Sequence, residues 1–307
     1  MSSVRRAIGS VLKKIFFRPP FVKHSVQTIY KSLQGSIYLH QSNILGDWLQ
    51  EAHYLVIILE NIQNSDGGFD TDYNYHFGSD LLHRKGQSLA CETTALTVIG
   101  QYRGIDPGED LDGFISSGLD WIKRNSVRKD KGVYTIPYCP DIVNDTIILN
   151  GISFTAAAMG KILKDNDDTG KEIYRGMISF LKNNMVISSD SGGRYWPYFE
   201  QGSSVISENE KKKIDYYHLA QQVEVHAIAQ QQMPLDEQYE IIKNGADHLV
   251  HIHHENGIIP YDNMGLFDGC IHTWGLSSVI PAMIEASKII SENRSEEHTS
   301  ELQSRQS

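Results

Sequence analysis

The stretch Gly257-Ile-Ile-Pro-Tyr261-Asp262 decides the fold, because the chain repeats its pattern. Gly132-Val-Tyr134-Thr-Ile-Pro-Tyr138 and Gly193-Arg-Tyr-Trp-Pro-Tyr198 are further copies, and Asp66-Gly-Gly68-Phe-Asp70 is a weaker one. One glycine from each copy falls at position 68, 132, 193 or 257, so successive copies lie 64, 61 and 64 residues apart. This period exceeds the roughly 34 to 47 residues of the common helical-pair solenoids. It predicts a long helical hairpin with an elaborated loop, laid down several times, whose loops face a shared cavity.

Between the copies, apolar residues recur at helical spacing and almost no alternation of period two occurs. The pattern predicts a helical or mixed segment over residues 21–39 and helices over residues 47–59, 89–103, 110–125, 146–163, 171–184, 216–233, 236–251 and 274–292. Helices that precede the repeated loops are amphipathic, whereas those that follow them are rich in small and apolar residues. This difference suits two concentric layers, so the sequence predicts an all-α fold, an (α/α) toroid of repeated helical hairpins, with short extended pieces at the rim of a cavity.

Composition narrows the class of protein. The net charge of −10 disfavours a nucleic-acid partner, whose phosphates would repel the chain. Three cysteines, Cys91, Cys139 and Cys270, lie far apart, which indicates reduced thiols and a cytoplasmic compartment. No apolar run approaches the eighteen residues that a membrane-spanning helix needs.

The two ends of the chain differ from the rest, and we place the toroid domain at residues 21–293. Residues 1–20 mix basic and apolar side chains, which predicts peripheral contact with the inner face of an anionic membrane or, alternatively, an ordinary docked helix. The stretch from Arg294 to Ser304 resembles the translation of a sequencing-library adapter, so we interpret residues 294–307 as an artefactual tail. Four clear hairpins are fewer than a closed six-hairpin toroid needs, and we expect the native protein to be longer and this chain to be truncated at its C-terminus.

Three of the repeated loops resemble those of α/α-toroid proteins from bacterial polysaccharide biosynthesis clusters. The resemblance rests on Pro137-Tyr-Cys-Pro-Asp141 leading to Asn150, on Gly193–Tyr198 leading to Asp215 and His218, and on Asn256–Tyr261 leading to Asp268 and His272. It covers roughly residues 45–293. It implies the architecture shared by six-hairpin glycosidases, toroid polysaccharide lyases, glucuronyl epimerases and terpenoid cyclases. The sequence lacks an isoprenoid-diphosphate box, which disfavours a cyclase, and the fold does not by itself fix one reaction.

Two Asp/His pairs are the leading catalytic candidates. Asp215 and His218 are three residues apart and Asp268 and His272 four apart, so each pair shares one helical face. There the aspartate can hold the histidine tautomer while the histidine acts as a base. The alternative is structural, with the aspartate capping a helix and the histidine bonded to a neighbouring loop.

Further candidates come from the aromatic loops and from two carboxylates. Tyr198 and Tyr261 are candidates for phenolic acid or base, or for packing the loops. Arg194 and Asn150 are candidates for neutralising a substrate carboxylate. The aromatic substrate-binding candidates are Trp196, Tyr134 and Tyr138. Asp66 and Glu92 are candidates for the carboxylate pair of a glycosidase, although Asp66 also suits a turn.

The prediction includes no cofactor and no metal. His248, His251, His253 and His254 lie close together, but no third spaced ligand completes a zinc pattern, and a solvated helix end explains them as well. The sequence therefore predicts a polysaccharide- or oligosaccharide-processing protein of capsule or exopolysaccharide biosynthesis, a lyase or epimerase acting on a uronic acid. A glycoside hydrolase and a non-catalytic glycan-binding scaffold are the alternatives.

Overall fold

A computed structural model of the chain describes residues 25–77, 81–142, 147–187, 194–200, 202, 207–263 and 277–291. The basic segment 1–20, the tail 294–307 and the candidates Asp268 and His272 lie outside these described residues. The helices predicted from the periodicity are confirmed, with shifted ends. They are α2 (Val26–Gln41), α3 (Trp48–Ile62), α4 (Thr94–Ile105), α5 (Asp112–Asn125), α6 (Leu149–Ile162), α7 (Asp168–Asn183), α8 (Tyr216–Gln230), α9 (Asp236–Asn256) and a last helix over residues 277–291.

Local chemistry explains several helix ends. Ser25, Asp47, Asp167 and Asp215 each precede a helix, and each side chain accepts a hydrogen bond from a backbone N–H of the first turn. Helix α9 runs to Asn256, farther than the predicted end at residue 251, and stops at Gly257, whose φ of +70° suits a glycine C-cap. The predicted helix over 89–103 begins as a single 3-10 turn, η1 (Ala90–Thr93), and a second such turn, η2 (Glu210–Lys212), precedes α8.

The repeated loops contain short antiparallel hairpins. They pair β1 (Tyr75–Phe77) with β2 (Leu81–His83), β3 (Val127–Asp130) with β4 (Val133–Thr135), and β5 (Val186–Ile187) with β6 (Arg194–Tyr195). Strands β4 and β6 fall in the Tyr-Thr-Ile-Pro-Tyr and Tyr-Trp-Pro-Tyr segments that the sequence marks as extended. Since each hairpin is only two strands wide, the architecture remains all-α.

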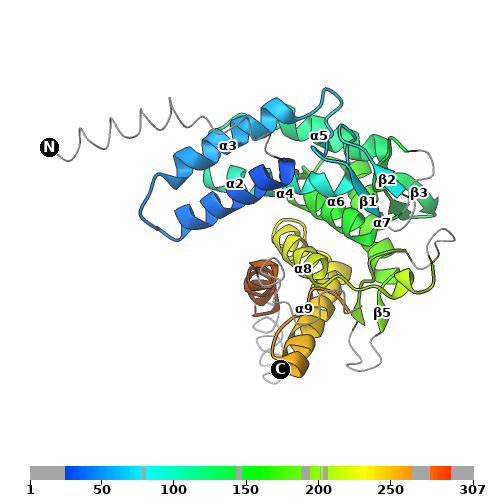
Figure 1. Cartoon of the computed structure of the whole chain (residues 1–307). Coiled ribbons are helices and arrows are strands. Elements are labelled where there is room, and N and C mark those ends of the chain that lie inside the picture. Colours follow the sequence, from blue (N-terminus) through cyan, green and yellow to red (C-terminus); the bar gives the residue numbers. More distant parts are fainter. Residues whose placement is uncertain are drawn as a thin grey trace, which may run out of the picture.

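The helices form two layers (Figure 1). The even-numbered helices contact one another in succession, α2 with α4, α4 with α6 and α6 with α8, and each odd-numbered helix packs outside them. Every residue of α6 except Lys161 is buried, whereas α5 buries one face only. This is the toroid of helical hairpins that the sequence predicts, with the small and apolar helices inside.

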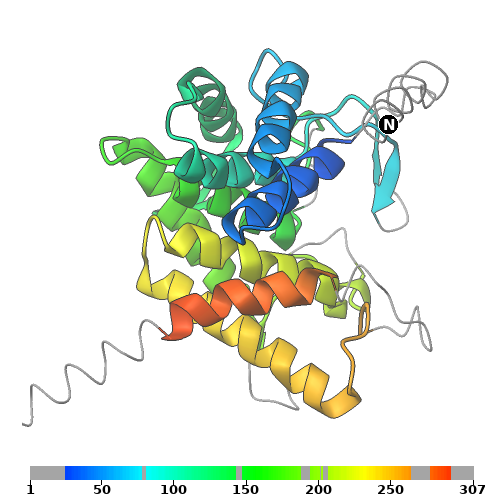
Figure 2. The same cartoon turned by 90° about the vertical axis from the view of Figure 1, so that its left-hand side faces the viewer.

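The last helix, 277–291, lies beside α8 (Figure 2). Side-chain hydrogen bonds join it to α2 and to the end of α8. The Tyr38 hydroxyl of α2 donates to Glu285 Oε1 at 3.4 Å, and Gln231 Nε2, at the end of α8, donates to Glu285 Oε2 at 3.1 Å. Among the described residues, no helix has the length and apolarity needed to cross a membrane.

Glycines allow the inner helices to pack closely. A Cβ added at Gly151 would lie 2.9 Å from the Tyr138 ring, and one added at Gly160 would lie 2.9 Å from the Tyr174 ring. The Tyr174 ring cannot move aside easily, because it is fully buried and its hydroxyl donates to the Met233 carbonyl at 3.1 Å. The small residues of α6 therefore set how closely its neighbours approach.

We expect Gly160→Ala to destabilise the fold, although alanine favours a helix. The added methyl group meets the fixed Tyr174 ring, and overpacking of this kind costs about 1–3 kcal/mol, more than the gain of at most about 1 kcal/mol in helix propensity. Urea unfolding measures the difference. Gly113→Ala on α5 is the matched control, because a Cβ there meets nothing within 4 Å, and it should stabilise the protein. Equal effects of the two changes would contradict this account of α6.

Candidate active site

A cavity of about 200 Å³ lies where the even-numbered helices begin. Its walls come from segments far apart in the sequence: the start of α2, the η1 turn before α4, helix α6, the loop after β6 and the first turns of α8. The residues that line it are Gln27, Tyr30, Tyr73, Leu89, Cys91, Glu92, Tyr138, Phe154, Tyr198, His218 and Gln221. The fold therefore brings four of the predicted site residues to one cavity, namely Glu92, Tyr138, Tyr198 and His218.

Asp215 and His218 form a hydrogen-bonded pair at the start of α8. The Asp215 Oδ1 atom accepts the backbone N–H of His218 at 3.1 Å, and Asp215 Oδ2 lies 2.7 Å from His218 Nδ1. The aspartate is thus both a helix cap and the hydrogen-bond partner of the imidazole, an arrangement that the structural and the catalytic interpretations both allow. Because Nδ1 is held by the carboxylate, Nε2 is the nitrogen that can exchange a proton with a ligand.

Asp215 has partners beyond His218. A side-chain hydrogen bond joins it to Tyr261, and the backbone of Asp215 bridges that of Asp262. Burial alone would raise the pKa of the Asp215 carboxyl, but the charge of His218 and the hydrogen bonds from it outweigh burial and lower that pKa. The carboxylate therefore stays ionised beside the imidazole. Burial, and then the charge of Asp215, raises the pKa of Tyr261, which remains a protonated donor.

Tyr198 packs against the histidine, with ring centroids 5.6 Å apart. Burial, and then the charge of Asp215, raises the pKa of Tyr198 well above its usual value, so its hydroxyl is protonated at neutral pH and suits an acid rather than a base. Lys213 Nζ lies 5.1 Å from the centre of its ring. The buried Asn150 amide lowers the pKa of Tyr198, against the larger effect of burial. Neither polar atom of the Asn150 side chain makes a hydrogen bond of ordinary geometry with the described residues.

Glu92 is the buried acid of the cavity. Only 6% of the residue is exposed, and burial raises the pKa of its carboxyl to about 7. The Cys91 thiol lies 3.9 Å from Glu92 Oε1, and Tyr138 Oη donates to Cys91 Sγ at 3.1 Å. Burial, and then the charge of Glu92, also raises the pKa of Cys91, which keeps the thiol protonated. Near neutral pH, Glu92 can therefore serve as a proton donor within this short chain of polar groups.

Other predicted site residues do not line this cavity. Trp196 is buried in the main core, and its indole N–H donates to the Leu181 carbonyl at 3.0 Å. Tyr134 of β4 donates its hydroxyl to Glu172 on α7, and Arg194 of β6 is exposed. These three differ from the expectation because their hairpins pack over the outer helices α7 and α9.

Asp66, the proposed partner of Glu92 in a carboxylate pair, does not line this cavity either. Asp66 Oδ1 accepts the backbone N–H of Gly68 at 3.0 Å, so its side chain shapes a turn. Gly67 in this turn has a φ of +92°, a conformation that favours glycine.

One interpretation of the sequence expected the histidines of α9 to form a solvated helix end. The structure shows this for only some of them. His248 is 2% exposed and stacks on Tyr195 with ring centroids 4.8 Å apart, and burial lowers its pKa to about 4. His253 and His254 lie in the last turn of the helix and are exposed. Across the described ranges, no cluster of three His, Cys, Asp or Glu side chains could hold a metal ion.

Sequence reasoning missed Cys91, Tyr30, Tyr73 and Gln221 as cavity residues, and Lys213 as the neighbour of Tyr198. One local signal was present, because Gln221 lies one helical turn after His218 and so shares its face. The others reach the cavity only through tertiary packing.

The sequence matches no family model and no curated relative. Solved structures share the fold. A sugar epimerase from a ruminal bacterium superposes with a TM-score of 0.61 at 12% identity, over 87% of this chain and 71% of that one. An unsaturated glucuronyl hydrolase specific for heparin gives 0.55 at 12% identity, over 88% and 76% of the two chains. A cold-adapted family 8 xylanase gives 0.54 at 10% identity, over 87% and 72%. At these identities the likeness establishes the toroid fold.

Glu92 should make the stability of the fold depend on pH. Its folded pKa of about 7 lies above the value of 4.5 for an unperturbed carboxyl. The folded state therefore binds this proton more tightly than the unfolded state does. The resulting contribution to the free energy of unfolding is fully present below pH 4.5 and is lost as the pH rises through 7. The loss amounts to roughly 3 kcal/mol at pH 8, at about 1.4 kcal/mol per pKa unit.

Glu92→Gln should remove this loss, because a glutamine does not ionise. Urea unfolding of both proteins should give a more stable variant at about pH 8 and a difference near zero at about pH 4.5. The exposed Glu51→Gln on α3 is the matched control and should follow the native curve. Parallel pH curves for the native chain and Glu92→Gln would show that the carboxyl is not held neutral.

Proposed function

We propose that this chain is a carbohydrate-active enzyme that moves a proton at a carbon atom of a bound sugar, as an epimerase or an eliminating lyase does. The observation that carries the proposal is the His218–Asp215 pair at the wall of a cavity that also holds the protonated Tyr198 and Glu92, whose carboxyl has a pKa of about 7. Proton abstraction next to a carbonyl group requires a general base in the right tautomer and a proton donor close to it.

In this scheme His218 Nε2 removes the proton from the carbon next to the sugar carbonyl, which a neutral sugar presents when its reducing end is in the open-chain form. The electrons of the C–H bond pass into an enolate, and Asp215 stabilises the imidazolium ion that forms. Tyr198 or Glu92 donates a hydrogen bond or a proton to the oxygen that becomes negative. Return of a proton to the opposite face of the carbon inverts it, which is epimerisation. Loss of the substituent on the next carbon is elimination.

A neutral sugar suits the cavity better than the uronic acid that the sequence suggested. The ionised Asp215 lies behind His218 at the wall, and Glu92 would become a second anion as the pH rises through 7. Both would repel a carboxylate on the ligand. Arg194, proposed from the sequence as the group that neutralises this carboxylate, is exposed on β6 and does not line the cavity.

The comparisons support a carbohydrate substrate. A sugar epimerase, a xylanase and a glucuronyl hydrolase all use this toroid, and all three act on sugars. Glycoside hydrolysis is the second candidate, and Glu92 favours it, because a carboxyl with a pKa of about 7 is the general acid that this reaction needs. Asp215 would then be the candidate for the second carboxylate.

Incubation with neutral and uronic oligosaccharides in heavy water tests the proposal. We expect the native protein to introduce deuterium at one sugar carbon, read by mass spectrometry and NMR. His218→Ala and Tyr198→Phe should each lower this rate by about 10²–10⁴-fold, the usual contribution of a general acid or base. The exposed His254→Ala and Tyr54→Phe are matched controls and should react like the native chain.

The other outcomes of that experiment are distinct. New reducing ends without deuterium on carbon would establish hydrolysis in place of proton transfer. Binding of a sugar with no chemical change would establish a non-catalytic glycan-binding protein. Unchanged deuterium incorporation in both His218→Ala and Tyr198→Phe would overturn the assignment of the site.

Two substitutions should distinguish the role of Asp215 as a helix cap from its role as the partner of His218. Asparagine caps helices as well as aspartate does, so Asp215→Asn should keep most of the stability, but it removes the charge that stabilises the His218 imidazolium. We expect kcat to fall by at least about 10²-fold with little change in the unfolding midpoint. Asp215→Ala should lower both quantities, with about 1 kcal/mol lost from the cap. An active Asp215→Asn enzyme would show that the aspartate serves the helix alone.

A further inference from the structure

A second, larger cavity of about 460 Å³ continues from the catalytic one. It runs between α2, α8 and the helix 277–291, and Gln27 and Gln221 line both cavities. Gln221 lies one helical turn beyond His218 on α8, so the second cavity begins next to the catalytic pair. Together the two volumes fall within the roughly 300–1,000 Å³ of small-molecule sites in proteins.

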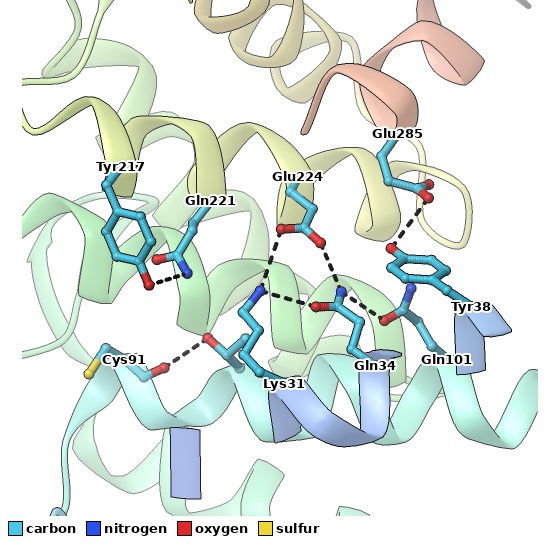
Figure 3. A network of polar contacts seen from close by, with 10 residues as sticks. Lys31, Gln34, Tyr38, Cys91, Gln101, Tyr217, Gln221, Glu224 and Glu285 are labelled. Atoms are coloured by element: carbon cyan, nitrogen blue, oxygen red, sulfur yellow. Dashed lines mark hydrogen bonds and ion pairs between the residues drawn. The ribbon is translucent and has the colours of Figure 1, made fainter. Parts of the chain in front are cut away.

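A buried carboxylate fixes the polar wall of this second cavity (Figure 3). Glu224 is 1% exposed, and its Oε1 accepts a hydrogen bond from Gln34 Nε2 at 2.9 Å. Lys31 Nζ lies 3.5 Å from Glu224 Oε2 and donates to Gln34 Oε1 at 3.0 Å. Because Glu224 holds both side chains, the ammonium and amide groups of α2 are in place before a ligand arrives.

Aromatic side chains complete the wall. Tyr217 accepts a hydrogen bond from Gln221 Nε2 at 3.1 Å, and Tyr38, farther along α2, donates to Glu285. A tyrosine offers a sugar ring an apolar face and a hydroxyl at its edge, and amide groups both donate to and accept from sugar hydroxyls. Ser277 and Ser278 of the last helix face the same space.

The charges in this wall are paired within the protein. Lys31 is matched by Glu224, and Glu285 is matched by Lys288, whose Nζ lies 2.6 Å from Glu285 Oε1. An ion pair that is already satisfied offers little net attraction to an anion or a cation. The wall therefore suits a neutral ligand rich in hydroxyl groups.

We propose that the second cavity is a subsite for a second neutral sugar unit, so that the enzyme acts on an oligosaccharide with one unit at His218 and the next between α2, α8 and the helix 277–291. The proposal rests on the proposed function for the identity of the first site. It goes further in assigning the size of the substrate and the residues, Lys31, Gln34 and Tyr217, that recognise the second unit.

Gly35 provides a test that removes none of these contacts. It lies within α2 on the cavity wall, and a Cβ added there meets nothing within 4 Å. Gly35→Leu should therefore fill the space with a side chain while favouring the helix. Gly113→Leu in the first turn of α5 is the matched control, because Gly113 is exposed, a Cβ there meets nothing within 4 Å, and it lines neither of these two cavities. Gly35→Ala, which adds one methyl group, gives a milder variant of the same kind.

Binding is measured by calorimetry with β-1,4-linked gluco-, manno- and xylo-disaccharides and their monosaccharides, and deuterium incorporation is read on the same samples. We expect the native chain to bind one of the disaccharides at least about tenfold more tightly than its monosaccharide. Gly35→Leu should lose this preference and keep its affinity for the monosaccharide, with an unfolding midpoint no lower than native. Gly113→Leu should behave as the native chain does.

The inference is overturned if the native chain binds no disaccharide of the set more tightly than the monosaccharide, or if Gly35→Leu binds the disaccharide as the native chain does. Failure of the proposed function gives a different result. The native chain would then still prefer the disaccharide, and Gly35→Leu would still lose this preference, but no deuterium would enter a sugar carbon. That result would support the subsite while removing proton transfer.

Discussion

The even-numbered helices all begin at one end of the molecule, and the rest of the structure depends on this constraint. In each hairpin the chain runs away from this end along an inner helix and returns to it along an outer helix. The repeat of slightly more than sixty residues is therefore one such hairpin with its loops. Residues as distant in sequence as Glu92, Tyr138, Tyr198 and His218 thereby reach the same cavity. The small residues of α6 keep this inner layer tight, because a larger side chain at Gly151 or Gly160 would collide with a tyrosine ring.

Asp215 shows how one carboxylate can serve both folding and chemistry. Its side chain satisfies a backbone N–H at the start of α8, and its second oxygen aligns the imidazole three residues on. Tyr261, from the next repeated loop, bonds to the same group. A buried carboxylate with fewer partners would take up a proton, as Glu92 does at near-neutral pH. The two acids of the site therefore differ in charge because they differ in the number of their partners.

Much of this was predictable from local spacing, and the remainder depends on long-range contacts. The period of the glycines gives the hairpins, Asp47 and Asp215 mark helix starts, and three-residue spacing pairs Asp215 with His218. By contrast, the aromatic residues of one loop divide between two environments, with Trp196 in the main core and Tyr198 at the cavity. Composition cannot tell these positions apart. The contact from Tyr138 to Cys91 spans 47 residues, and no local pattern encodes it.

The shared starting end of the inner helices also has an electrostatic consequence. A helix carries about half a positive charge at its N-terminus, so the helices that begin around the cavity direct their dipoles to one point. Each contributes about 0.3–1 kcal/mol to a nearby anion such as the ionised Asp215. A negative charge that forms on a sugar oxygen only during reaction meets the same dipoles, which are already oriented and need no rearrangement.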